Sequence, residues 1–212
     1  GRNNNPFFNL DSALKYIVNA EKLYHEADLK ARRTFNEYSV DSIRIQIHKS
    51  KVCRNAYEWA KEKHTIADYE HFLTYYNHYP EFSHEITKRR DELAYKLAQA
   101  GNTSKSYKKF MDDYPQSAQI KKATDAYHYR LYKELTVKET VKDLAAFIEN
   151  YPKNPYNEEA QDKLFEKFIK KNSIEYYAGF IRNFPENRNV SVAWRILYKL
   201  YTKEYSPEKI VE

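Results

Sequence analysis

Four segments of one pattern recur along the chain, each with an aromatic residue immediately before a proline. They read YYNHYP ending at Pro80, FMDDYP at Pro115, FIENYP at Pro152 and FIRNFP at Pro185. The prolines lie 35, 37 and 33 residues apart. A repeat of about 34 residues is the length of a unit built from two antiparallel helices. The repeat therefore predicts an all-α fold made of helical hairpins.

Large apolar residues stand at positions −8, −5, −4 and −1 counted from each proline. Offsets of three, four and seven residues place such side chains on one face of a helix. Residues that cap helix N-termini stand at −12 in every unit, and proline disfavours helical geometry in the residue before it. We therefore predict a short helix from about −12 to −1 in each unit. The predicted caps are Asp68, Thr103, Thr140 and Ser173, and the predicted stripes are Phe72, Tyr75, Tyr76 and Tyr79; Tyr107, Phe110, Met111 and Tyr114; Leu144, Phe147, Ile148 and Tyr151; and Tyr177, Phe180, Ile181 and Phe184.

A second helix is predicted after each proline. The last three units carry an alanine at +8, namely Ala123, Ala160 and Ala193, followed by large apolar residues at +12 and +16. A small side chain lets two helices approach closely, so these alanines are expected at helix–helix contacts. In the first unit the stripe shifts by one residue, to Leu93 and Leu97.

These patterns resemble tetratricopeptide-repeat (TPR) proteins, in the style of bacterial envelope TPR lipoproteins that assist outer-membrane barrel assembly. The segment FIENYPKNPYNEEAQDKL carries the resemblance most closely, and the resemblance extends over residues 65–212. It implies an α-α superhelix (a TPR-like solenoid) that binds another protein through a concave groove in a cell-envelope assembly, with a periplasmic or envelope-associated location. The chain departs from the family in having Asp, Thr or Ser at −12 in place of a small residue, and in lacking the usual glycine of the longer helix.

The repeats divide the chain into a region 1–64 and an array over 65–212. The array has units 65–102, 103–139, 140–172 and 173–205, and the start of a fifth unit at 206–212, where Ser206 takes the capping position. Residues 10–64 are interpreted as a long helical hairpin, a diverged unit with a turn at Ser39–Asp41. The expected apolar stripes of its two helices are Leu14, Ile17, Leu23, Tyr24 and Ala27, then Ile43, Ile47, Ala56, Tyr57 and Trp59.

Catalysis and cofactor binding are not predicted. The chain has only three glycines and contains no phosphate loop, dinucleotide fingerprint or GxSxG motif. The segment HEITK at 84–88 lacks the second histidine of a zinc protease motif, and the single cysteine, Cys53, is expected to be a small buried residue. No run of about 18 apolar residues predicts a membrane span.

The predicted function is that of a non-catalytic scaffold that binds a protein or peptide of unknown identity. In the predicted solenoid the helices after the prolines line the groove, and their polar positions form the candidate partner-binding set. This set comprises Arg90, Lys122, Tyr129, Glu159, Lys163, Arg195 and Lys199. Its mixed charges favour a protein surface over a phosphate backbone.

The alternative is a helical-repeat RNA-binding protein. Such proteins read one base per repeat with similar polar residues at matching positions. Position +10 instead reads Arg90, Asp125, Asp162 and Arg195, and the net charge of +6 is spread without a continuous basic stripe. Binding to nucleic acid is therefore disfavoured.

Overall fold

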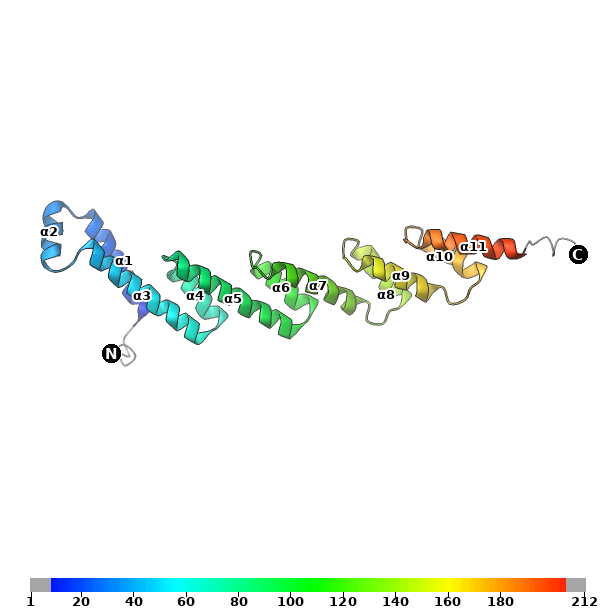
Figure 1. The fold of residues 1–212 in the computed structure, drawn as a ribbon, viewed down its shortest axis with the longest axis horizontal. Coiled ribbons are helices and arrows are strands. Elements are labelled where there is room, and N and C mark those ends of the chain that lie inside the picture. The colour runs from blue at the N-terminus through cyan, green and yellow to red at the C-terminus, as the bar shows by residue number, and fades with distance from the viewer. Residues whose placement is uncertain (1–8, 205–212) are drawn as a thin grey trace, which may run out of the picture. The chain divides into compact units, whose positions relative to one another are not determined.

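The computed structural model describes residues 9–204, and within that range every regular element is an α-helix (Figure 1). The all-α prediction is thus confirmed, and no helix in residues 9–204 combines the length and apolar character needed to cross a bilayer. The helices are α1 (Leu10–Glu26), α2 (Leu29–Glu37), α3 (Ser42–Lys63), α4 (Ile66–Tyr75), α5 (Pro80–Gly101), α6 (Ser104–Asp113), α7 (Ile120–Leu135), α8 (Val141–Asn150), α9 (Asn157–Phe168), α10 (Ile174–Asn183) and α11 (Val190–Glu204). The predicted fifth unit at 206–212 lies outside the described residues.

The chain forms two compact units. Unit 1 takes in the chain as far as residue 97 together with residues 116–119, and unit 2 takes in residues 98–115 and the chain from residue 120 onward. In unit 1, α3 packs against both α1 and α4. In unit 2, three hairpins form from α6 with α7, α8 with α9, and α10 with α11. The predicted boundary between the region 1–64 and the repeat array lies inside unit 1, between α3 and α4. The division of the chain into repeat units stays a prediction.

The region before residue 64 contains three helices, so the prediction of two long helices was wrong. The chain leaves helical geometry at Ala27, and the Asp28 carboxylate accepts a hydrogen bond from the Ala31 N–H at 2.7 Å, which starts α2. An aspartate at this position satisfies an N–H that a continuous helix would bond internally, and it thereby favours a new start. The predicted turn at Ser39–Asp41 is confirmed, since Asp41 caps α3 and Ser39 has a φ of 61°.

The buried face of α3 also differs from the predicted one. Ile45, Val52, Cys53, Ala56 and Ala60 are buried, and all but Ile45 belong to one hydrophobic core with α1, α4 and the start of α5. Helical periodicity puts these residues on a common face and turns the remaining apolar residues away from it. Desolvation in this core raises the pKa of the Cys53 thiol to about 11. Of the predicted stripe residues, Leu23 of α1 and Ile43 and Ile47 of α3 are more than half exposed and Trp59 is 41% exposed, whereas the predicted Ala56 is buried.

The short helices of the last three units begin as predicted. Thr103 and Thr140 accept hydrogen bonds from the backbone N–H three residues later, at 3.0 and 3.1 Å, and Ser173 occupies the same capping position without a side-chain bond. Each of these helices ends two residues before its proline, so the aromatic residue at −1 is the C-cap. The residue before each proline is thus non-helical, as the steric effect of proline predicts.

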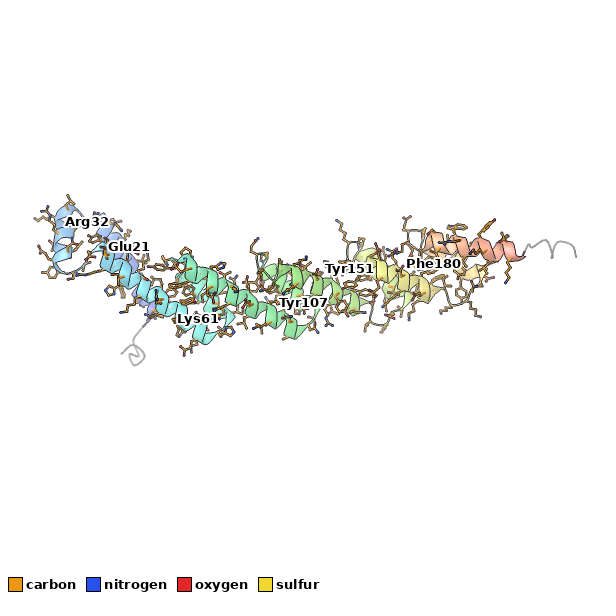
Figure 2. All side chains as sticks on the ribbon, in the orientation of Figure 1. Glu21, Arg32, Lys61, Tyr107, Tyr151 and Phe180 are labelled. Carbon is orange, nitrogen blue, oxygen red and sulfur yellow. The ribbon has the colours of Figure 1, made fainter. Side chains whose placement is uncertain are left out.

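A buried phenylalanine anchors the end of each short helix. In α8 the Phe147 ring centroid lies 5.5 Å from that of the C-cap Tyr151, and the Phe147 carbonyl accepts the Tyr151 N–H at 2.9 Å. The same pair of contacts recurs in the other units, and Figure 2 labels Tyr151 and Phe180. The equivalent pairs are Phe110 with Tyr114, Phe180 with Phe184 and, in unit 1, Phe72 with Tyr76.

The first repeat requires a correction of register. Thr65, and not Asp68, caps α4, and Tyr76 is its C-cap. Pro80 opens α5 instead of ending α4. The pattern Thr-x₃-Tyr-x₂-Phe-x₃-Tyr starting at Thr65 matches the one starting at Thr103, whereas the YxxYP match lies three residues further on by coincidence. As a result Tyr75 and Leu97, both predicted to be in the core, are exposed.

The alanines at +8 are buried as predicted. Ala123, Ala160 and Ala193 have no exposed surface, and the last two belong to the hydrophobic core formed by α7 to α11. Large side chains from the facing helices, including Phe147 and Phe180, fill the rest of this core. A methyl group at these positions leaves room for those rings.

A polar residue stands two positions after each of the last three prolines; Ser117 and Asn154 are buried, and Asn187 is half-buried. The Asn154 Oδ1 accepts the Tyr156 N–H at 2.9 Å, while its Nδ2 donates to the His128 carbonyl of α7 at 3.3 Å. Asn187 repeats both contacts with the Asn189 N–H and the Gln161 carbonyl of α9. Ser117 makes only the contact within the loop, since its Oγ accepts the Gln119 N–H at 3.2 Å. The Asn side chains therefore set the loop and tie it to the preceding helix.

Replacing Ala160 or Ala193 with leucine is expected to overpack this core and lower the free energy of unfolding by about 1–3 kcal/mol. Urea denaturation followed by circular dichroism measures the change. Ala146→Leu, at an exposed position of α8, is the matched control and should leave the midpoint nearly unchanged. Equal midpoints for all three variants would contradict the assignment of the +8 position.

Replacing Asn154 with alanine is expected to lower the free energy of unfolding by about 1–3 kcal/mol, because the Tyr156 N–H loses its acceptor and the bond from the loop to the His128 carbonyl of α7 is lost. The exposed Asn172→Ala is the control of the same residue type. Urea midpoints again provide the measurement. A loss no larger than that of Asn172→Ala would show that Asn154 is not an inter-hairpin tie.

Candidate partner-binding surface

The seven predicted contact residues lie on four helices, α5, α7, α9 and α11. Tyr129 is 38% exposed, and Lys122, Glu159, Arg195 and Lys199 are also exposed. Lys163 and Arg90 are half-buried. Three of the seven, Tyr129, Glu159 and Lys163, belong to one group of contacting side chains in unit 2.

This group, the Tyr132 cluster, consists of Tyr129, Tyr132, Glu139, Tyr156, Glu159 and Lys163. The Tyr156 ring stacks on Tyr132 with an interplanar angle of 4° and a centroid distance of 5.4 Å, and it lies 5.5 Å from Tyr129. The Tyr132 hydroxyl donates to Glu159 at 3.1 Å. The Lys163 ammonium lies 5.6 Å from the centroid of the Tyr132 ring, within range of a cation–π contact.

Local structure brings the charged members of the cluster together. Glu139 has a φ of 45°, a left-handed conformation just after α7, and its carboxylate bonds Lys163 on α9 at 2.6 Å. Lys163 also lies 3.5 Å from Glu159 one turn earlier, and Lys167 lies 3.5 Å from Glu139. The loop after α7 is therefore tied to α9 by an ion-pair network.

Electrostatics hold these side chains in fixed protonation states near neutral pH. Burial raises the pKa of Tyr132, and the hydrogen bond to Glu159 raises it further against the opposing effect of Lys163. The hydrogen bond to Glu139 raises the pKa of Lys163, and the same bond lowers the pKa of Glu139. Tyr132 therefore stays neutral while Lys163 and Glu139 stay charged.

The other four predicted residues are not part of this cluster. The Arg90 guanidinium bonds the carboxylate of its neighbour Asp91 at 2.8 and 3.0 Å, and Asp91 is buried, so this pair has a structural role in α5. Lys122 is exposed in the first turn of α7. Arg195 and Lys199 are exposed one turn apart on α11.

Sequence reasoning missed a depression of about 480 Å³ in unit 1. Its lining residues include Glu58, Glu62 and Asp68 and the partly exposed Trp59. At its edge the Asp11 carboxylate accepts hydrogen bonds from Tyr76 and, at 3.0 Å, from His71. Burial raises the pKa of Asp11, but these two hydrogen bonds outweigh that effect and lower it. The depression draws residues from α1, α3 and α4, and no local spacing in the sequence connects them.

Within residues 9–204, no three His, Cys, Asp or Glu side chains are arranged to hold a metal ion. The carboxylates of the Tyr132 cluster are engaged by Lys163 and by the Tyr132 hydroxyl. Tyr129 and Glu159 of the cluster are exposed, whereas Tyr156 and Lys163 are half-buried. The prediction that the chain is not an enzyme stays a prediction.

Replacing Lys163 with methionine is expected to lower stability at pH 7, and the deficit relative to wild type should shrink at both pH extremes. The pKa of Glu139 is depressed below its usual 4.5, so its ion pair stabilises the fold above that pH and is lost as pH falls below it. The pKa of Lys163 is raised above its usual 10.5, so its contribution is complete below that pH and fades above it. Urea midpoints at several pH values measure the difference in stability. Lys142→Met, at an exposed lysine of α8, is the control. A deficit that does not change with pH would contradict a stabilising ion pair between Lys163 and Glu139.

Comparison with known proteins does not assign the chain to a family. No protein-family model matches it, and no curated protein is significantly similar to it in sequence. The resemblance to envelope TPR lipoproteins therefore stays a prediction carried by the repeat pattern. Conclusions about function depend on the geometry of the described residues.

Proposed function

We propose that the chain is a non-catalytic helical-repeat scaffold that binds a protein or peptide partner. In this proposal the helical hairpins form a TPR-like superhelix, the helices after the prolines line its groove, and the assembly it serves belongs to a bacterial cell envelope. The repeated hairpins and their regular spacing support the superhelix. The resemblance of the repeat pattern supports the envelope setting.

The observation that carries the proposal is the Tyr132 cluster. Tyrosine is enriched among the residues that contribute most to binding at protein interfaces, and side chains already held in their bound geometry lose little entropy on association. Stacking on Tyr156 and the ion pairs of Lys163 hold these side chains in place, while Tyr129 and Glu159 remain accessible. A peptide lying along α7 and α9 would meet ring edges, a hydrogen-bond acceptor and an ammonium group within two turns of helix.

A site-specific crosslinking experiment tests this surface. A benzophenone amino acid at position 129 is expected to crosslink a partner in an extract of the native source, and the same group at the exposed position of Tyr38 in unit 1 serves as the control. Tyr129→Ala should then weaken binding of the purified partner by about tenfold or more, the effect of losing one well-placed interface tyrosine. Circular dichroism should show unchanged helicity.

The outcome also separates the two classes of partner. A partner captured equally at positions 38 and 129, and bound equally by Tyr129→Ala, would contradict the proposed surface. RNA captured at position 129, with an affinity that falls steeply as salt rises, would instead support the RNA-binding alternative.

A further inference from the structure

The first half of α3 carries apolar side chains on its outer face. Ile43 and Ile47 are four residues apart, so they share one side of the helix, and they are 71% and 57% exposed. The loop before α3 adds Val40 and Tyr38, which is 78% exposed. The other face of α3 already packs on α1 and α4. Large apolar side chains gathered on an exposed surface, unlike single scattered ones, commonly mark an interaction site.

Basic side chains continue this outer face. Lys51 stands four residues after Ile47, and Arg54 stands three residues after Lys51, so both lie on the same side of α3. Both are exposed, and residues 42–57 contain no Asp or Glu. The ion pairs of α3 within residues 9–204 are those of Arg44 with Asp41, Lys49 with Glu21 and Lys61 with Glu58. The charges of Lys51 and Arg54 are therefore not neutralised by described residues.

The surface along these residues is one-sided. A shallow depression follows α3 from Ile43 to Arg54, and the one lining residue from another segment is Tyr79, just before α5. A groove that holds a peptide helix has walls on two sides. The face of a single helix, with apolar residues at one end and basic residues at the other, suits a planar surface better.

The chain that adjoins this face on both sides is described and leaves it uncovered. α2 precedes it and the rest of α3 follows it, and in Figure 1 α2 lies beside the start of α3. The Lys49 ammonium of α3 bonds Glu21 near the end of α1 at 2.8 Å. Asn9, the first described residue, caps the opposite end of α1, about 18 Å from Glu21 at the helical rise per residue.

We propose that the outer face of α3 binds the surface of an anionic lipid bilayer. Ile43 and Ile47 would enter the boundary between head groups and acyl chains, while Lys51 and Arg54 would contact lipid phosphates. Helices bind such surfaces by burying apolar side chains and by the attraction of basic residues to anionic lipids. Tyr38 suits this setting, because tyrosine rings favour the level of the head groups. The inference goes beyond partner binding at the Tyr132 cluster and does not depend on it.

Vesicle flotation tests the proposal with the full chain. The protein is expected to float with vesicles of phosphatidylcholine mixed with phosphatidylglycerol, to float less as salt rises, and not to float with phosphatidylcholine alone. The double variant Ile43→Ser with Ile47→Ser should bind the mixed vesicles at least about tenfold more weakly, since it removes the inserted apolar groups. Its matched control is Val137→Ser, at an exposed apolar residue of unit 2.

Charge reversal provides the second arm. Lys51→Glu with Arg54→Glu should also weaken binding at least about tenfold, because two attractions become repulsions. Lys142→Glu with Lys153→Glu, at exposed lysines of unit 2, makes the same change in net charge and should leave binding nearly unchanged. Circular dichroism should show unchanged helicity in all four variants. Tyr129→Ala should float as the wild type does, so failure here is distinguishable from failure of the proposed function.

Three outcomes would overturn the proposal. The first is equal flotation with neutral and mixed vesicles, and the second is unchanged binding by both double variants of α3. The third is no flotation with either kind of vesicle. If the chain then binds a soluble acidic peptide through Lys51 and Arg54, or self-associates in a way that Ile43→Ser with Ile47→Ser abolishes, the occupant of this face is a protein and not a lipid surface.

Discussion

The packing of one phenylalanine against the aromatic residue four positions later holds each short helix in place. Phe72, Phe110, Phe147 and Phe180 are almost fully buried, and the carbonyl of each accepts the N–H of the aromatic C-cap that follows. The same pair of residues thus caps the end of the helix and contributes a buried ring to the hydrophobic core. A helix of ten residues has little stability in water by itself, so it forms because its aromatic face is buried against the longer helices packed beside it. The buried alanines Ala123, Ala160 and Ala193 provide the space for that burial.

Connections between hairpins use polar contacts as well as rings. Asn154 and Asn187 each bond a loop N–H and a carbonyl of the preceding long helix, so the loop and the helix are fixed together. A buried amide is costly unless its donors and acceptors are paired, and pairing on both sides makes it directional. The two asparagines therefore add orientation to contacts that the hydrophobic core alone would leave less specified.

The Tyr132 cluster joins the hydrophobic core of unit 2 to polar groups at its surface. Tyr132 is fully buried and packs on Phe147, while its hydroxyl reaches Glu159 near the surface. The polar ends of the cluster thus depend on the core for their positions.

Local patterns were enough to predict the helical class, the starts of the last three repeats and the burial of the +8 alanines, because a stripe at offsets of three and four, a capping residue and a small +8 residue each act locally. Thr103, Thr140 and Ser173 stand where the pattern predicts, and Cys53 is buried. Local patterns could not separate a coincidental YxxYP at Pro80 from the true C-cap at Tyr76, nor choose which of two apolar faces of α3 would be buried. Tertiary packing decided both, as it decided that Tyr129, Glu159 and Lys163 would meet while Arg90 would bond Asp91. Contacts between residues more than 20 positions apart, such as those of Lys163 with Glu139 and of Asn154 with His128, depend on how the hairpins pack, and no short spacing in the sequence encodes them.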